Sequence, residues 1–389
     1  MIKNLKIKKL LINTIFRGLS VINSILPKED NMVLLYSNMG FRDNVGYLYT
    51  YMIEHNYNIN YRIIRSQNEP FVGIVPSNVV VVNNIEAIFY YLKAGHVFYT
   101  FGKLPIYPSK NQKVVQMWHG SPFKGADKKQ ESEITNNHTQ SYYTNVLSAS
   151  EIFTEFWAEK FDCGKKRISI CGHPRTDVMI YPYRKEELDI LNKKLVIWMP
   201  TFRKSKKLGY DDIATFNNII PIVEDSEFQK LNTEISKLNI YLIVKLHPMQ
   251  DTDSLRTIKF SNINLMTHEK FNNMGLDLYR LLGTADALIT DYSSVFYDFM
   301  LINRPIAFTE DDIDDYKESR GFAVNDPNYF RAGHKIKTFN DLITFLKDVS
   351  EENDPWKEQR NKVNNKVNKY RDFMNSKRAL KIGGVFEDV

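Results

Sequence analysis

The amino-acid sequence predicts an α/β protein with two domains, each built on a largely parallel β-sheet. The chain has 389 residues, which exceeds one ordinary core and suits two domains of common size. From residue 30 onward, short runs of apolar, β-prone residues alternate with helical patterns. Continuous apolar strands between helices indicate parallel sheets that are covered on both faces. A polar, turn-rich stretch at 181–193 separates two such series.

Each series supplies five expected strands. They lie at 32–37, 61–66, 78–83, 96–102 and 113–118 in the first half, and at 194–200, 240–248, 262–267, 287–292 and 305–310 in the second. Helical patterns occupy 45–56, 85–94 and 148–161, then 214–238, 275–285, 294–302 and 338–351. The lysine- and asparagine-rich segment from 355 to 378 predicts one further helix.

Composition and charge narrow the class of protein. Apolar residues make up 43% of the chain and charged residues 25%, the balance of a globular protein. The net charge of +6 suits an anionic partner such as a nucleic acid, an anionic membrane or a phosphorylated substrate. Cys163 and Cys171 form neither a disulfide framework nor a metal-type spacing, so we expect reduced thiols and a cytosolic compartment. No apolar run reaches the roughly 18 residues that span a bilayer.

Residues 1–26 have the pattern of a basic amphipathic helix. Cations precede any acid, at Lys3, Lys6, Lys8, Lys9 and Arg17. Apolar residues mostly three or four positions apart mark one face: Ile2, Leu5, Leu10, Leu11, Ile15, Leu19, Ile22 and Leu26. We favour attachment to an anionic membrane surface, where such helices lie among the headgroups. A mitochondrial transit peptide and a helix that packs on the next domain are alternatives; a signal peptide fits poorly because polar residues interrupt the apolar stretch.

Polar residues with useful chemistry follow four of the predicted strands. His119 follows the strand at 113–118, Thr201 and Arg203 follow 194–200, His247 follows 240–246, and Asp291, Ser293 and Ser294 follow 287–290. Ligands of parallel α/β sheets bind outside the carboxyl ends of the strands. Because these residues come from segments far apart in sequence, their convergence predicts an active site.

The segment at 285–301 suggests a phosphate site. Asp291, Ser293 and Ser294 lie where a helix begins, and free N–H groups and the positive dipole end attract phosphate there. Ordinary capping of the helix by Ser293 or Asp291 is the alternative. Asp298 lies about one turn further on, where it either bonds a ribose hydroxyl or is a surface acid.

Cationic residues follow two other strands and would neutralise a pyrophosphate without a metal. They are Lys245 and His247 in VKLHP and Arg203 in MPTFR. Arginine suits phosphate because its fork donates two parallel hydrogen bonds. Lys245 is alternatively an edge residue that snorkels, and the lysines at 204–207 a solvated loop. We expect the acid-rich segment 310–316 to be a solvated loop.

Two histidine motifs are candidates for catalysis. His119 in QMWHGSPFKG follows a strand and precedes Gly120 and Ser121, so it lies on a loop. Histidine changes charge near neutral pH, which makes His119 the natural general base for a hydroxyl nucleophile. His173 lies in CGHPRTD with Arg175 and Asp177, which we expect to line a cleft or to be structural. A pair between Arg175 and Asp177 is one hypothesis for that motif.

Several other classes lack their motifs. The sequence contains no P-loop, no GxGxxG after a strand and no GxSxG elbow. It also shows no recognised nucleic-acid module, so we expect no nucleic-acid partner.

Taken together, these motifs resemble the CDP-glycerol:poly(glycerophosphate) glycerophosphotransferase family of teichoic acid and capsule synthesis. QMWHGSPFK, GHPRTD, MPTFR, KLHP and ITDYSSVFYDFM followed by RPIAF occur in the family's order, over roughly 100–330. The resemblance implies a GT-B-like fold, in which two Rossmann-type domains with parallel sheets face a central cleft. It also implies peripheral attachment to the cytoplasmic face of the cell membrane.

The resemblance assigns roles to segments and residues. It divides the chain into a membrane-associating helix (1–27), an acceptor-side domain with His119 (28–185), a donor-side domain (186–354) and a helical tail (355–389). His119 matches the family's base and His247 the histidine near the donor phosphates. Arg203, Lys245, Asp291, Ser293, Ser294 and Asp298 would bind the donor's phosphates and ribose. Gly120, Ser121, Arg175, Asp177 and Thr201 would line the cleft.

The implied reaction moves glycerol phosphate from CDP-glycerol to a hydroxyl of a membrane acceptor and releases CMP. The acceptor would be an undecaprenyl-diphosphate-linked disaccharide or a glycerophosphate-primed lipid, and no cofactor or metal is needed. Three alternatives stay open: a CDP-ribitol donor, a GT-B glycosyltransferase that uses a UDP-sugar, and a non-enzymatic binding protein of the membrane.

Overall fold

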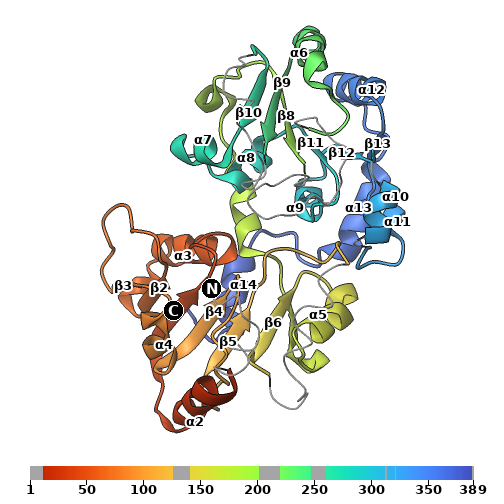
Figure 1. Ribbon diagram of the computed structural model, residues 1–389. Coiled ribbons are helices and arrows are strands. Elements are labelled where there is room, and N and C mark those ends of the chain that lie inside the picture. Colours follow the sequence, from red (N-terminus) through yellow and green to blue (C-terminus); the bar gives the residue numbers. More distant parts are fainter. Residues whose placement is uncertain are drawn as a thin grey trace. The chain divides into compact units, whose positions relative to one another are not determined.

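The computed structural model describes residues 12–125, 141–200, 220–246, 260–311, 313–319 and 321–387. These residues divide into two compact units (Figure 1). Those of unit 1 lie in Met1–Ser121, Asp127–Asp177 and Asn368–Val389, and those of unit 2 in Pro122–Ala126 and Val178–Val367. Each unit holds one sheet of parallel strands with helices, so the predicted α/β class is confirmed.

The sheet of unit 1 has seven described strands in the order β3-β2-β1-β4-β5-β6-β7. Their bounds are β1 Glu29–Tyr36, β2 Arg62–Ser66, β3 Val79–Val82, β4 Ala94–Tyr99, β5 Lys113–Gln116, β6 Asn145–Ser148 and β7 Ile168–Ile170. The chain builds outward from β1 to β3 on one side, and then from β4 to β7 on the other. This reversal places a topological switch point between β1 and β4, where ligands of such sheets bind.

Helices of unit 1 cover its sheet. They are α2 Arg17–Ile25, α3 Asn44–Glu54, α4 Glu86–Tyr91, α5 Thr154–Lys160 and α14 Asn375–Ile382. Short 3-10 turns lie at Tyr57–Ile59, Glu151–Phe153 and Lys165–Arg167. The core joins the apolar strands to α3 and α14, with Leu35, Phe98, Leu48 and Leu380 fully buried in one cluster. Full burial of such a side chain contributes about 2 kcal/mol.

Unit 2 repeats the plan with six described strands in the order β10-β9-β8-β11-β12-β13. Their bounds are β8 Lys194–Met199, β9 Ile240–Lys245, β10 Ile263–Met266, β11 Ala287–Thr290, β12 Ile306–Thr309 and β13 His334–Ile336. The helices are α6 Phe228–Lys237, α7 His268–Asn273, α8 Leu278–Thr284, α9 Val295–Phe299, α10 Ile313–Ser319, α11 Pro327–Phe330, α12 Phe339–Ser350 and α13 Lys357–Val367. The switch point of this sheet lies between β8 and β11.

The chain after residue 354 is divided between the two units. The predicted single helix from 355 to 378 is wrong, because α13 ends at Val367 and α14 begins at Asn375. α13 belongs to unit 2, whereas α14 packs in the core of unit 1.

The acid-rich segment at 310–316 was predicted to be a solvated loop, which is wrong for Glu310 and for the helix that begins at Ile313. The Glu310 side chain is 8% exposed and forms an ion pair of 2.8 Å with Arg331, which is fully buried. α10 begins within this segment, and the Tyr316 ring stacks on that of Tyr292 at 3.7 Å between centroids. Glu310 therefore lies beside an internal cation and Tyr316 lies in an aromatic stack, which charge patterning alone does not reveal.

α2 packs on unit 1 through its polar residues. Asn23 is fully buried, and its side-chain nitrogen donates to the Tyr107 carbonyl and to Gln112 Oε1, both at 2.9 Å. The buried Ser20 hydroxyl accepts from the Tyr107 N–H at 3.0 Å. Exposed apolar side chains are instead found on and beside the helix: Ile15 55%, Val21 59%, Ile22 47%, Ile25 78% and Leu26 39% exposed. The helix thus has the reverse of the usual orientation, in which apolar residues face the core.

Candidate active site

Loops from the carboxyl ends of four strands converge at the switch point of unit 1. The Thr100 hydroxyl, just after β4, accepts from the Val45 N–H at the start of α3 at 2.9 Å. This bond joins the loop after β1 to the loop after β4. The loop after β5 carries residues 117–121, and the loop after β7 carries residues 171–177. Two of the predicted motifs therefore meet next to the start of α3.

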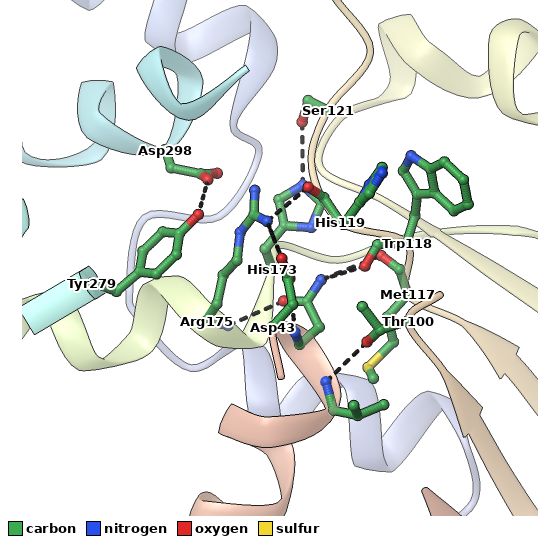
Figure 2. A network of polar contacts seen from close by, with 12 residues as sticks. Asp43, Thr100, Met117, Trp118, His119, Ser121, His173, Arg175, Tyr279 and Asp298 are labelled. Carbon is green, nitrogen blue, oxygen red and sulfur yellow. Dashed lines mark hydrogen bonds and ion pairs between the residues drawn. The ribbon is translucent and has the colours of Figure 1, made fainter. Parts of the chain in front are cut away.

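The buried guanidinium of Arg175 ties these loops together. Its Nη1 donates to Asp43 Oδ1 at 3.1 Å and Oδ2 at 2.9 Å, and to the His119 carbonyl at 2.7 Å (Figure 2). Asp43 also accepts from the Asn44 N–H at 2.8 Å, so it caps α3 as well. Bonds between charged groups at such distances are among the stronger ones in proteins. Arg175 therefore fixes the backbone at His119 relative to the start of α3.

Asn44 makes a second bridge beside Arg175. It is fully buried, its side-chain nitrogen donates to the Trp118 carbonyl at 2.8 Å, and its oxygen accepts from the Arg175 N–H at 3.2 Å. The backbone on both sides is strained, with φ of 59° at Asp43 and 54° at Trp118. Non-glycine residues rarely adopt positive φ, and such strain persists where surrounding bonds over-determine it. Here Arg175 and Asn44 supply those bonds.

The His119 imidazole is half-buried in an aromatic setting. Its ring centroid lies 4.1 Å from that of Trp118 and 4.7 Å from that of Phe101, the latter edge to face. Gly120 follows with φ of 139°, a conformation that glycine adopts without cost. The loop thus holds the main chain of His119 through its carbonyl while part of the ring stays accessible to a ligand.

His173 is a buried, neutral neighbour of this site. Its Nε2 lies 3.3 Å from the buried Ser121 hydroxyl. Burial, and next the positive charge of Arg175, lower the pKa of His173 to about 3. It therefore carries no charge at neutral pH and makes a poor general base there, which agrees with its predicted rank below His119.

Acidification is expected to destabilise unit 1 through His173. The unfolded chain takes up a proton near about pH 6.5, whereas the folded protein does so only near pH 3. The free energy of unfolding should therefore fall as pH decreases below about 6.5, by up to about 1.4 kcal/mol per pH unit from this group. Urea unfolding at several pH values measures that slope. His173→Gln should flatten it, whereas replacing the exposed His55 by glutamine should not; equal slopes in the His173 variant and the native protein would contradict the assignment.

Asp177 lies next to the site but does not pair with Arg175, so that hypothesis is wrong. Its two carboxylate oxygens accept from the backbone N–H groups of Asn375 at 2.9 Å and Ser376 at 2.6 Å. Asn375 also accepts from the Gly172 N–H at 3.1 Å through its side-chain oxygen. Asp177 therefore anchors the start of α14, and Arg175 turns to Asp43 because that carboxylate lies at the switch point.

In unit 2, the predicted phosphate loop follows β11. Asp291 is fully buried, and its Oδ1 accepts from the Tyr292 N–H at 2.5 Å. Ser293 and Ser294 are half-buried, and Ser294 precedes α9 without a side-chain capping bond. α9 has only five residues and continues as the 3-10 turn Met300–Ile302, so the two together match the predicted helix at 294–302. The serine hydroxyls are therefore not consumed by capping of this helix.

Lys245 and Asp298 are the other predicted donor residues in the described part of unit 2. Lys245 ends β9, is half-buried, and holds its Nζ 5.1 Å from the centre of the Phe271 ring. Asp298 is 1% exposed and accepts from the Tyr279 hydroxyl at 2.8 Å, which excludes the surface-acid alternative (Figure 2). Thr201, Arg203 and His247 lie outside the described residues.

Asp43 and Asn44 are site residues that the sequence analysis missed. Only one signal pointed to them, since the pair Asp43–Asn44 immediately precedes a predicted helix at 45–56, where a cap is expected. Their contacts to Arg175 and Trp118 depend on β1 lying next to β4, which local patterns do not specify.

Residues 19–382 match the protein family described as CDP-Glycerol:Poly(glycerophosphate) glycerophosphotransferase. The chain belongs to this family. The match includes the His119, His173–Asp177 and Asp291–Ser294 motifs, and the resemblance inferred from them is confirmed.

Curated relatives of this glycerophosphotransferase family member are teichoic acid enzymes. It is 27% identical to the teichoic acid poly(glycerol phosphate) polymerase of Bacillus spizizenii, over 77% of this chain and 78% of the relative. It is 26% identical to the teichoic acid glycerol-phosphate transferase of Staphylococcus aureus, over 90% and 91%. Other relatives are longer: the chain covers 43% of the teichoic acid poly(glycerol phosphate) polymerase of Staphylococcus epidermidis, at 28% identity over 77% of this chain.

Among solved structures, the family member is similar to the wall teichoic acid polymerase TagF. The TM-score is 0.71 at 22% identity, over 97% of this chain and 94% of the other. A complex of Staphylococcus aureus MnaA with UDP also matches, with a TM-score of 0.51 at 9% identity over 90% and 95%. These likenesses confirm the predicted GT-B-like fold.

Proposed function

We propose that this protein transfers glycerol phosphate from CDP-glycerol to a hydroxyl of a lipid-linked acceptor, with release of CMP, in teichoic acid or related polymer synthesis. The observation that carries the proposal is the placement of His119. Its half-accessible ring lies at the switch point of unit 1, and Arg175 and Asn44 hold its loop. Membership of the glycerophosphotransferase family supports the reaction class.

In this mechanism His119 is the general base. Its imidazole takes the proton of the acceptor hydroxyl, whose oxygen attacks the glycerol-side phosphorus of CDP-glycerol in line. A new P–O bond to the acceptor forms, the P–O bond to the CMP phosphate breaks, and CMP leaves with the bonding electrons. Because phosphoryl transfer demands mainly positioning and charge stabilisation, a base held by a fixed loop suits this task.

The donor groups on unit 2 complete the proposal. Ser293 and Ser294 offer hydroxyl donors after β11, and Lys245 offers a cation after β9. We assign Arg203 and His247 to the same phosphates, and Asp291 and Asp298 to the phosphate and ribose loop. Donors aimed at developing negative charge are often the largest single contribution to catalysis.

A donor screen tests this proposal. CMP release from CDP-glycerol and CDP-ribitol, and UDP release from UDP-sugars, would be measured with and without a lipid-linked disaccharide or a glycerophosphate-primed lipid. We expect acceptor-dependent CMP release from CDP-glycerol. A preference for CDP-ribitol would change the proposed donor from the glycerol to the ribitol compound. The ribitol-phosphate polymerases among the relatives make this donor the alternative to test. Turnover of a UDP-sugar alone would overturn the reaction class.

We also propose that α2 attaches the protein to the cytoplasmic face of an anionic membrane. No described helix is long and apolar enough to cross a bilayer. α2 instead turns its polar residues to unit 1 and leaves Val21, Ile22 and Ile25 exposed. An exposed apolar face on a basic N-terminal segment fits burial at the boundary of headgroups and acyl chains.

Charging the exposed face of α2 is expected to release the protein from membranes. Val21→Asp combined with Ile25→Asp should weaken binding to phosphatidylglycerol vesicles about 100-fold, because two buried apolar side chains are lost. Sedimentation with vesicles measures this change. Ile59→Asp is the matched control, since Ile59 is 70% exposed but lies on another element of unit 1. Undiminished binding of the α2 variant would exclude this attachment.

A further inference from the structure

The buried His96 on β4 has carbonyl oxygens at both ring nitrogens. Its Nδ1 lies 2.7 Å from the Gly383 carbonyl, and its Nε2 lies 2.8 Å from the Asp30 carbonyl. His96 is only 8% exposed. A neutral imidazole has one N–H and one lone pair, so it satisfies only one of two carbonyl acceptors. An imidazolium has two N–H groups and satisfies both.

Both carbonyls lie where regular structure is interrupted. The register between β1 and β4 shifts between Glu29 and Val33, and Asp30 lies in that irregular stretch. Gly383 is the C-cap of α14, where the last carbonyls of a helix have no partner within it. The C-terminal end of a helix also carries partial negative charge, which favours a cation.

We propose that His96 is held as an imidazolium that latches the C-terminal end of α14 to the sheet of unit 1, and that loss of its proton releases this end. Without the second N–H, a lone pair would face a carbonyl oxygen at less than 3 Å. Leaving a buried acceptor unsatisfied is costly, so the contact to Gly383 or to Asp30 would open.

The latched end is built to fit closely against β4. Gly384 has φ of 79°, and the N–H groups of Gly384 and Val385 bond back to the carbonyls of Lys381 and Leu380 at 3.1 and 2.9 Å. This is the bonding of a glycine-capped helix end. A Cβ on Gly383 would lie 2.2 Å from the Phe98 ring, so only glycine admits this approach.

α14 connects the latch to the candidate active site. Its first residues bind Asp177 through the backbone N–H groups of Asn375 and Ser376, and its C-cap Gly383 approaches His96. Beyond the latch, the Phe386 N–H donates to the Tyr61 hydroxyl at 3.2 Å, and the segment lines a surface hollow of about 510 Å³. Release of the latch would let the segment that lines this hollow move. It would also loosen one end of α14, the helix that supports the motif at 171–177.

The groups facing His96 set the charge balance of the latch. The Asp30 carboxylate on β1 favours the cation. Lys113, the β5 residue that pairs with His96 in the strand register, opposes it. The Tyr61 ring lies 6.1 Å from the imidazole, edge to face.

Nuclear magnetic resonance of the full chain tests the latch without any assay of activity. Long-range ¹H–¹⁵N spectra should show both His96 nitrogens protonated below neutral pH. Amide-exchange protection of residues 379–385, corrected for intrinsic rates, should fall about fivefold as that proton is lost. A neutral His96 ring at pH 6, or protection that does not change across its titration, would overturn the proposal.

Two variants sharpen this test. His96→Arg keeps a cation with several donors and should make protection of 379–385 independent of pH. His96→Gln has no charge and should give low protection at every pH. The spectra of the native protein decide the question if a variant does not fold. Retained, pH-dependent protection in a folded His96→Gln would contradict the latch.

Discussion

His119→Ala is expected to lower acceptor-dependent CMP release about 1,000-fold, because a positioned general base contributes roughly 10² to 10⁴ to such rates. The affinity for CDP-glycerol should stay within about twofold, since the donor groups of the proposal lie in unit 2. The rate constant for turnover and the dissociation constant for the donor therefore need separate measurement, by steady-state kinetics and by calorimetry.

His55→Ala is the control for this substitution. His55 follows the last residue of α3, the helix that begins at the site with Asn44, so it lies about 16 Å away along the helix. It is exposed and stacks on Tyr51. Its loss should leave turnover unchanged. Near-normal turnover of His119→Ala with intact donor binding would show that another group takes the proton.

Arg175→Ala is expected to lower the free energy of unfolding by about 3 kcal/mol. It should also reduce the turnover rate by at least as large a factor as it reduces the affinity for the donor. The side chains of Arg175 and Asp43 are 5% and 19% exposed, and removing one partner of a buried pair leaves the other uncompensated. The His119 carbonyl would lose its donor in the same step. Urea unfolding measures the stability, and the CMP assay measures turnover.

A double-mutant cycle isolates the Asp43–Arg175 contact. Asp43→Asn, Arg175→Ala and the double variant should give a coupling energy of about 1 to 3 kcal/mol. The exposed pair Lys165–Glu155, 63% and 77% exposed, provides the comparison and should couple by less than about 1 kcal/mol. Additive effects of Asp43→Asn and Arg175→Ala would contradict the clamp.

Much of the fold could be predicted because its central strands are buried on both faces. The runs at 32–36 in β1, 195–199 in β8 and 240–244 in β9 are apolar, so they stand out as parallel strands. β6, β7 and β13 were missed because each has three or four residues of mixed polarity, such as NVLS and HKI. Their pairing comes from neighbouring strands rather than from local pattern.

The candidate site was predictable where a site residue comes directly after a strand in the sequence. His119 and Asp291 each come just after a readable strand, so the rule on carboxyl ends located them. The partner of Arg175 was not predictable, because Asp43 is 132 positions away and the nearby Asp177 competes in the sequence. The sequence also did not show that the apolar face of α2 points away from unit 1. Periodicity identifies an apolar face of a helix but not what that face contacts.

Analysis of the acceptor product distinguishes glycerol phosphate transfer from the alternative reactions. After incubation with CDP-glycerol and a lipid-linked acceptor, ³¹P spectra and mass spectra of the extracted lipid would be compared with the amount of CMP formed. The proposed function predicts a new glycerol phosphodiester on the acceptor, in one-to-one ratio with CMP for each unit added, and its loss in His119→Ala. An acceptor without added phosphorus, or one extended by a sugar from a UDP donor, would contradict it.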